Sequence, residues 1–214
     1  VLDSLRDFLR HCAKHGDPAA AFQAIQERNY GRSQRYIPVQ MAGLTSGMPY
    51  VCLRVPTGGG KTFLACHAVG VAIHELLRAD RAVVLWLVHR NTILDQTADA
   101  LRDSRHPYRR ALEMACGPIE IMTINEALRI SRPIVDGQTV VIVATIQSFR
   151  VEDTTGRKVY DTNGAFLEHV QNPPLSRVDD LLPGPDGKPV PSLVNMLRLR
   201  RPIVIVDEAH NART

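Results

Sequence analysis

The sequence predicts an α/β fold, with a mostly parallel β-sheet and helices on both of its faces. Four apolar runs have the length of strands and are apolar on both faces, as buried parallel strands are. They are residues 50–55, 81–88, 139–144 and 202–206. Segments with apolar residues at helical spacing lie between these runs, and alternating strands and helices are typical of a layered α/β protein. A weaker strand is expected at 119–124.

The composition is that of an ordinary globular protein, with 44% hydrophobic, 22% charged and 5% aromatic residues. A length of 214 residues fits one main domain. No apolar run reaches the roughly 18 residues that a bilayer requires, and the first residues lack a signal-peptide pattern. We therefore expect a cytoplasmic protein with no membrane partner. The net charge of +4 permits a polyanionic partner without establishing one.

The cysteines and one histidine pair give weak signals for a metal site. The four cysteines form no C-x-x-C pair: Cys12, Cys52, Cys66 and Cys116. Cys52 and Cys66 fall at expected core positions, so reduced thiols fit better than disulfides or zinc. His11 and His15 are four residues apart and could share a metal, but solvated side chains are favoured because no third ligand lies nearby in the sequence.

Residues 1–35 are predicted to form a helical extension ahead of the main domain at 36–214. Apolar residues share one face of a first helix: Leu2, Leu5, Leu9 and Cys12. That helix should end near His15, because Gly-Asp-Pro follows at 16–18. A second, short helix is expected at 19–27.

The strongest chemical signal is the stretch Val55-Pro56-Thr57-Gly58-Gly59-Gly60-Lys61-Thr62. It joins the first strand to a helix expected at 63–77. Glycines let backbone N–H groups converge on phosphate oxygens, and the helix N-terminus adds about half a positive charge. Lys61 would reach the β- and γ-phosphates of ATP, and Thr62 would place its hydroxyl on Mg²⁺. The alternative is a plain glycine-rich turn, and Val55 stands where the P-loop consensus has glycine.

Gln40 lies at the start of a helix expected at 39–45, one helix and one strand ahead of Lys61. A helix followed by a strand of that length would return the chain to the nucleotide. The amide could then offer adenine a donor and an acceptor together. A solvated glutamine at a helix start is the alternative.

Polar residues follow the second and third strands. One cluster is 89–96, which contains Arg90, Thr92 and Gln96, and the other contains Thr145, Gln147 and Ser148. Because ligands of open α/β sheets bind at the carboxyl ends of the strands, both clusters are expected at that one edge. An ordinary loop and helix cap, with Asn91 or Thr92 as the cap, is the alternative for the first cluster.

Residues 150–191 are rich in Gly, Pro and Asp and are predicted to be a loop-rich insertion. Within it, 166–170 is expected to be helical, and a hairpin could turn at Asp186-Gly187. A further helix at 193–199 would lead into the last strand.

The last strand ends in Asp207-Glu208-Ala209-His210. Asp207 would hold Mg²⁺ through a water, and Glu208 would orient and deprotonate the attacking water. His210 fits a residue that senses a neighbouring domain better than a metal ligand. A chance D-E-A-H is the alternative, but it is weakened by the β-branched run before it and the glycine loop upstream.

The combination resembles the first motor domain of superfamily 2 helicases of the DEAH-box type, a RecA-like P-loop NTPase domain. It is most similar to the helicase (Res) subunit of type III restriction enzymes. By this resemblance 56–62 is motif I, 207–210 is motif II, and Gln40 is the adenine-reading glutamine. The clusters at 89–96 and 145–148 are similar to motifs Ia and Ib, which touch the nucleic-acid backbone.

The resemblance implies a nucleic-acid-stimulated ATPase that uses ATP and Mg²⁺, with DNA favoured over RNA. A second motor domain with an arginine finger is expected outside this chain, so the fragment alone should be nearly inactive. A methyltransferase or specificity subunit is a further implied partner. The alternative is a regulatory ATPase switch that never moves along DNA. The polar clusters favour the motor, because a switch needs no ligands for backbone phosphates.

Overall fold

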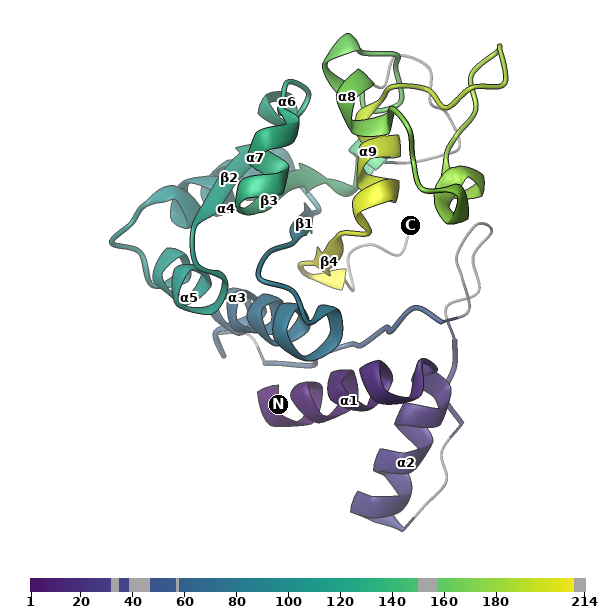
Figure 1. Cartoon of the computed structure of the whole chain (residues 1–214). Helices are drawn as coiled ribbons and strands as arrows, with labels where there is room; N and C mark the ends of the chain where they lie inside the picture. The colour runs from purple at the N-terminus through teal and green to yellow at the C-terminus, as the bar shows by residue number, and fades with distance from the viewer. Residues whose placement is uncertain (32–34, 39–46, 57, 150–157, 210–214) are drawn as a thin grey trace. The chain divides into compact units, whose positions relative to one another are not determined.

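A computed structural model describes residues 1–31, 35–38, 47–56, 58–149 and 158–209. The chain forms two compact units, Val1–Asp80 and Arg81–Thr214, and each is described by itself (Figure 1). The boundary expected near residue 35 stays a prediction.

The first unit begins with two helices, α1 (Leu2–His15) and α2 (Pro18–Tyr30). Gly16 ends α1 because it adopts φ 68°, and its N–H donates to the Cys12 carbonyl over 2.9 Å. Asp17 then caps α2 by accepting from the N–H groups of Ala19 and Ala20. Both predicted helices are confirmed, although α2 extends beyond the expected end at residue 27.

The helix after the glycine loop is also confirmed. It starts as α3 (Lys61–Val71) and continues without a break as η1 (Ala72–Leu77), a π-helical segment. Arg78, with φ 50°, ends it. Cys66 is buried in α3, as expected.

The strand predicted at 50–55 is wrong. These residues form no strand, and Tyr50 and Val51 are exposed. A strand needs a partner backbone, and the four strands that the structure describes all belong to the second unit. The Tyr50 N–H instead donates to the Tyr36 hydroxyl over 3.3 Å. Cys52 lies in this stretch and is exposed, so its expected core position is wrong too, although none of the four cysteines is in a disulfide.

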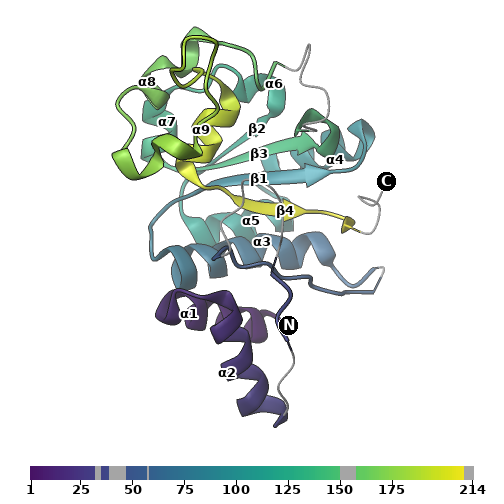
Figure 2. The ribbon, with the colours of Figure 1, turned by 90° about the vertical axis from the view of Figure 1, so that its right-hand side faces the viewer.

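The second unit is built on a parallel sheet in the order β2-β3-β1-β4 (Figure 2). Its strands are β1 (Val83–Val88), β2 (Ile119–Thr123), β3 (Thr139–Thr145) and β4 (Ile203–Val206). Every residue of β3 is buried, because β3 is flanked by strands on both sides and covered on both faces. The predicted α/β class and the four strand segments of this unit are confirmed.

Helices cover both faces of this sheet (Figure 2). One face carries Leu85 and Ile142 and packs on α6 (Ile124–Ala127), α7 (Arg132–Gly137) and α9 (Leu193–Arg200), and α8 (Leu167–Val170) lies against α9. The other face carries Trp86 and packs on α4 (Asn91–Arg102) and α5 (Pro107–Cys116). No helix that the structure describes has both the length and the apolar character needed to span a bilayer.

The described part of the insertion, 158–191, is folded onto the sheet. It contains η3 (Gly164–Phe166), α8 and η4 (Leu175–Asp180), and Phe166 is fully buried in the core. The expected hairpin turn forms, with Gly187 at φ 76° and an antiparallel bridge between Pro183 and Pro189.

Asn195 of α9 fastens the insertion. Its side chain is fully buried and accepts from the Leu182 N–H over 2.8 Å. It donates to the carbonyls of Leu182 (2.9 Å) and Val190 (2.8 Å). Both N–H groups of this amide and its oxygen therefore hold the loop.

Candidate functional site

Two of the three loop glycines have backbones that other residues rarely adopt. Gly58 has φ 78° and Gly60 has φ 73°. Gly59 is needed for a different reason, because a Cβ there would lie 2.8 Å from Val55 Cγ1 and 3.0 Å from the Pro56 carbonyl oxygen. A side chain at any of the three positions would therefore distort the loop.

The loop closes directly into α3. The Gly59 N–H donates to the Pro56 carbonyl over 3.0 Å, and Gly60 is the N-cap, whose carbonyl accepts from Leu64 over 2.8 Å. Lys61 is the first residue of α3, so the N–H groups of the first turn, which have no acceptor within the helix, begin at the loop. Such a helix start favours anions. Val55, which departs from the P-loop consensus, fills the space behind Gly59.

The acidic pair stands directly after β4. The Asp207 N–H donates to the Leu87 carbonyl over 2.9 Å, which extends the β1–β4 pairing by one residue. Glu208 has φ 52°, a left-handed conformation that costs a non-glycine residue about 1 kcal/mol or more. Asp207 is half-buried and Glu208 is exposed. The turn thus places a carboxylate on the surface at a strained position, which is a feature of functional sites.

The polar cluster after β1 surrounds the start of α4. Arg90 occupies the N-cap position, and its carbonyl accepts from the N–H groups of Ile93 and Leu94. The alternative of Asn91 or Thr92 as the cap is therefore wrong. Thr92 and Gln96 are exposed and one turn apart, so they share a face of the helix.

The cluster after β3 lies in η2 (Ile146–Phe149) and its approach. Thr145 Oγ1 and Ser148 Oγ lie 3.0 Å apart and share a hydrogen bond. Gln147 is exposed.

Strand register brings the two clusters and the acidic pair to one edge of the sheet. In β1, Val88 lies opposite Thr145 of β3, and Leu87 lies opposite Val206 of β4. Arg90, Thr145 and Asp207 are therefore at the carboxyl ends of three adjacent strands, as predicted.

Strand β2, which pairs with β3, ends at the same edge, and a capping box starts α6 there. Glu126 accepts from the Thr123 N–H (2.6 Å) and hydroxyl (2.8 Å) and also binds Arg102. The Thr123 N–H is the main cause that lowers the pKa of Glu126. This capping box gives the edge a fixed backbone beside the proposed ligands.

Several predicted ligands cannot be placed from the structure. Gln40, Thr57 and His210 lie outside the described residues. Gly58 to Thr62 belong to the first unit and Asp207 and Glu208 to the second, so each half of the site is described alone. The residues present fit Mg²⁺ and ATP, since a glycine loop with no room for a Cβ at Gly59 precedes a lysine and a hydroxyl in one unit, and carboxylates follow a strand in the other.

A cavity of about 370 Å³ lies at the start of β1, lined by Arg81, Asp136 and Arg200 among others. Arg200 Nη2 lies 2.6 Å from Asp136 Oδ1, and Arg132 Nε lies 3.2 Å from Oδ2. Burial raises the pKa of Asp136, but these two arginines outweigh it and the pKa is lowered. The charges are thus paired within the fold, and we assign the cavity no ligand.

Two important groups could not have been found from sequence. The hydrogen bonds of Asn195 use a polar residue in the core. The ion pair between Arg10 and Glu75 joins residues far apart in the chain.

Comparison with known protein families shows what this chain is similar to. The sequence model described as "Type III restriction enzyme, res subunit" matches residues 21–214. Searches of the curated proteins and of the solved structures found no match.

Proposed function

The chain belongs to the type III restriction enzyme res subunit family, a family of helicase-like ATPases, and from this we propose that it is the ATP-binding and hydrolysing half of a nucleic-acid-dependent helicase or translocase. The chain corresponds to the first motor domain of a superfamily 2 helicase. We propose DNA as its nucleic acid, in keeping with the family's description.

The observation that carries the proposal is the shape of the glycine loop. Gly58 and Gly60 have left-handed backbones, Gly59 has no room for a side chain, and Lys61 opens α3. A loop of this shape can present its remaining backbone N–H groups in front of a helix N-terminus, which would suit the phosphates of ATP. Lys61 adds the charge that neutralises the β- and γ-phosphates.

Hydrolysis would use the residues at both halves of the site. Bound Mg²⁺ neutralises charge on the phosphate oxygens. Thr62 and Asp207 are oxygen donors of the kind that hold it. Glu208 would orient the attacking water and take its proton, and we propose that His210 couples this step to a neighbouring domain.

Adenine recognition is assigned to Gln40, whose amide can make two hydrogen bonds to the base edge. Thr57 would complete the loop ahead of the glycines. Both assignments are proposals from the sequence alone.

The nucleic acid would lie along the carboxyl edge of the sheet. Arg90 offers a charge, and the remaining ligands are neutral hydrogen-bond donors: Thr92, Gln96, Thr145, Gln147 and Ser148. Such side chains contact the phosphate backbone and position it without reading the sequence. A second motor domain, and a methyltransferase or specificity subunit, are the proposed protein partners.

Phosphate release by the 214-residue chain tests this function. We expect very slow release by this chain alone and release that rises with DNA when a second motor domain is also present, where Glu208→Gln should stop it while ATP binding is retained. The reason is that Gln keeps the shape of Glu but cannot accept the proton. Glu168→Gln, a change at an exposed carboxylate on α8, is the matched control and should behave like the parent.

Two outcomes would contradict the proposal. Rapid release that ignores DNA would favour a self-contained regulatory ATPase. Release by Glu208→Gln equal to that of the parent would remove Glu208 from the reaction.

A further inference from the structure

Helix α1 lies outside the region matched by the family, which starts at residue 21, yet it is built into the unit that carries the glycine loop. It packs along both α3 and η1. Leu5, Phe8, Leu9 and Cys12 form its buried face. This apolar contact covers the second half of the helix that Lys61 begins.

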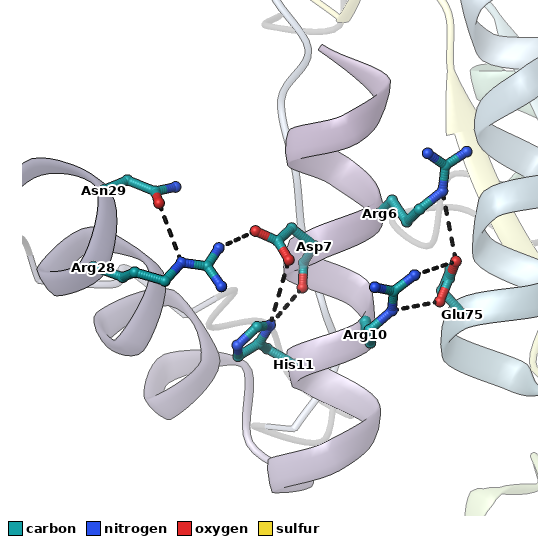
Figure 3. Close-up of polar contacts among 7 residues, drawn as sticks. All are labelled: Arg6, Asp7, Arg10, His11, Arg28, Asn29 and Glu75. Carbon is teal, nitrogen blue, oxygen red and sulfur yellow. Dashed lines mark hydrogen bonds and ion pairs between the residues drawn. The ribbon is translucent and has the colours of Figure 1, made fainter.

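Charged groups add a directional tie to this apolar contact (Figure 3). Arg10 binds Glu75 of η1 through two hydrogen bonds of 3.0 Å, and Arg6 Nε lies 3.5 Å from the same carboxylate. The Arg10 hydrogen bond is the main cause that lowers the pKa of Glu75. The Glu75 side chain is only 21% exposed, so the fork of Arg10 holds it in one geometry.

The tie acts on a stiff element that ends at the nucleotide loop. Residues from Lys61 to Leu77 form one uninterrupted helix, α3 followed by η1. A slip of one residue along a helix moves every side chain by about 1.5 Å and turns it by about 100°. Such a slip would break the two hydrogen bonds between Arg10 and Glu75. These bonds therefore fix both the position of the helix along its axis and its rotation about that axis.

The π-helical form of η1 makes this fixation useful. π-Helices, whose hydrogen bonds join residues five apart, are rare. They occur frequently at functional sites. Conversion of η1 to an α-helix would move Glu75 away from Arg10. The ion pair therefore stabilises η1 in its π-helical form.

We propose that Arg6, Arg10 and Glu75 are positioning residues for nucleotide binding: through them, α1 holds the helix that begins at Lys61 in the register in which the loop N–H groups converge. This inference rests on the proposed ATP site. It gives residues 1–20 a role in the site although the family match does not include them. By linkage, bound nucleotide must strengthen the docking of α1 to the same degree that α1 strengthens nucleotide binding.

A neighbouring face of α1 supplies a matched control. Asp7 binds Arg28 of α2, and His11 Nδ1 lies 2.8 Å from the Asp7 carbonyl oxygen (Figure 3). This second ion pair joins α1 to α2 instead of to η1. Its loss should affect the stability of the helical pair without affecting the loop.

The test is titration of the 214-residue chain with a fluorescent ATP analogue and Mg²⁺, beside thermal unfolding. We expect Glu75→Gln to weaken binding about fivefold, and Glu75→Arg to weaken it further because three guanidinium groups then meet. The double variant Arg10→Glu with Glu75→Arg should regain part of the loss. Arg28→Gln should bind like the parent even if its melting temperature falls.

Amide hydrogen exchange supplies a readout that a purely structural ion pair would not change. Saturating nucleotide should slow exchange in α1 of the parent, and this protection should shrink in Glu75→Gln. If the parent binds nucleotide but Glu75→Gln and Glu75→Arg bind as tightly as Arg28→Gln, the inference is wrong and the ion pair only stabilises the fold. If the parent itself fails to bind, the proposed function fails instead.

Discussion

Replacement of the loop glycines by alanine tests whether the shape of the loop binds the nucleotide. Gly60→Ala puts a Cβ on a backbone with φ 73°, and Gly59→Ala puts one 2.8 Å from Val55 Cγ1. Gly47→Ala is the matched control in the same unit, since its Cβ would have no neighbour nearer than 3.9 Å and its φ is not positive.

The structure sets the size of each effect. A left-handed backbone costs an alanine about 1–2 kcal/mol, so a loop that must adopt it to bind should lose about 5- to 30-fold in affinity in Gly60→Ala. Gly59→Ala should lose more, because carbon atoms normally approach only to about 3.5 Å and the Pro56 carbonyl is also 3.0 Å away. The backbone itself must move to relieve that contact.

Val55 provides a second-site check. In Gly59→Ala, the nearest clash is with Val55 Cγ1, which Val55→Ala removes. The double variant should therefore recover part of the lost affinity, while the contact with Pro56 remains. Recovery of this kind cannot come from a general loss of stability.

Fluorescence titration with an ATP analogue measures these affinities, and thermal unfolding shows whether each variant is folded. If folded Gly59→Ala and Gly60→Ala both bind as tightly as Gly47→Ala, the convergence of N–H groups in this loop has no part in nucleotide binding, and the reasoning is refuted.

Three further predictions follow from the second unit. Asn195→Asp should lower the melting temperature strongly at pH 7 and less at pH 4, because a carboxylate would face two carbonyl oxygens and is tolerated only when protonated. The control Asn125→Asp, at an exposed position, should show no such change. Equal melting temperatures of the two variants would contradict the buried hydrogen bonds of Asn195. Burial lowers the pKa of His169, whose Nε2 lies 3.1 Å from the Ile130 carbonyl, so the parent should lose stability as pH falls below the unfolded pKa of about 6.5. His169→Leu should have a lower melting temperature than the parent at pH 8, and this difference should shrink at pH 5. A difference that stays constant with pH would refute the lowered pKa of His169. Arg90→Ala should weaken DNA binding in fluorescence anisotropy and reduce its salt dependence by about one counterion, whereas an unchanged salt slope would remove this residue from the interface.

The sheet of the second unit was predictable because its signal is local. The runs at 83–88 and 139–145 are apolar on both faces, which only a strand flanked and covered by other elements tolerates. The run at 50–55 has a similar pattern but forms no strand, since pairing depends on a partner that the run itself does not specify.

The candidate site divides in the same way. The order of glycines before Lys61 is a local pattern, and the shared edge of Arg90, Thr145 and Asp207 follows from parallel topology. The ion pair of Glu75 with Arg10 joins positions 65 residues apart, and no rule of spacing predicts such a contact.

Titration calorimetry of the 214-residue chain with ATP and Mg²⁺ tests the central claim most directly. The parent should bind one ATP, and Lys61→Ala should abolish binding because the charge on the β- and γ-phosphates is no longer neutralised. Lys188→Ala, at an exposed turn of the insertion, should bind like the parent. Equal affinity of Lys61→Ala and the parent would contradict the assignment of this loop as the ATP site.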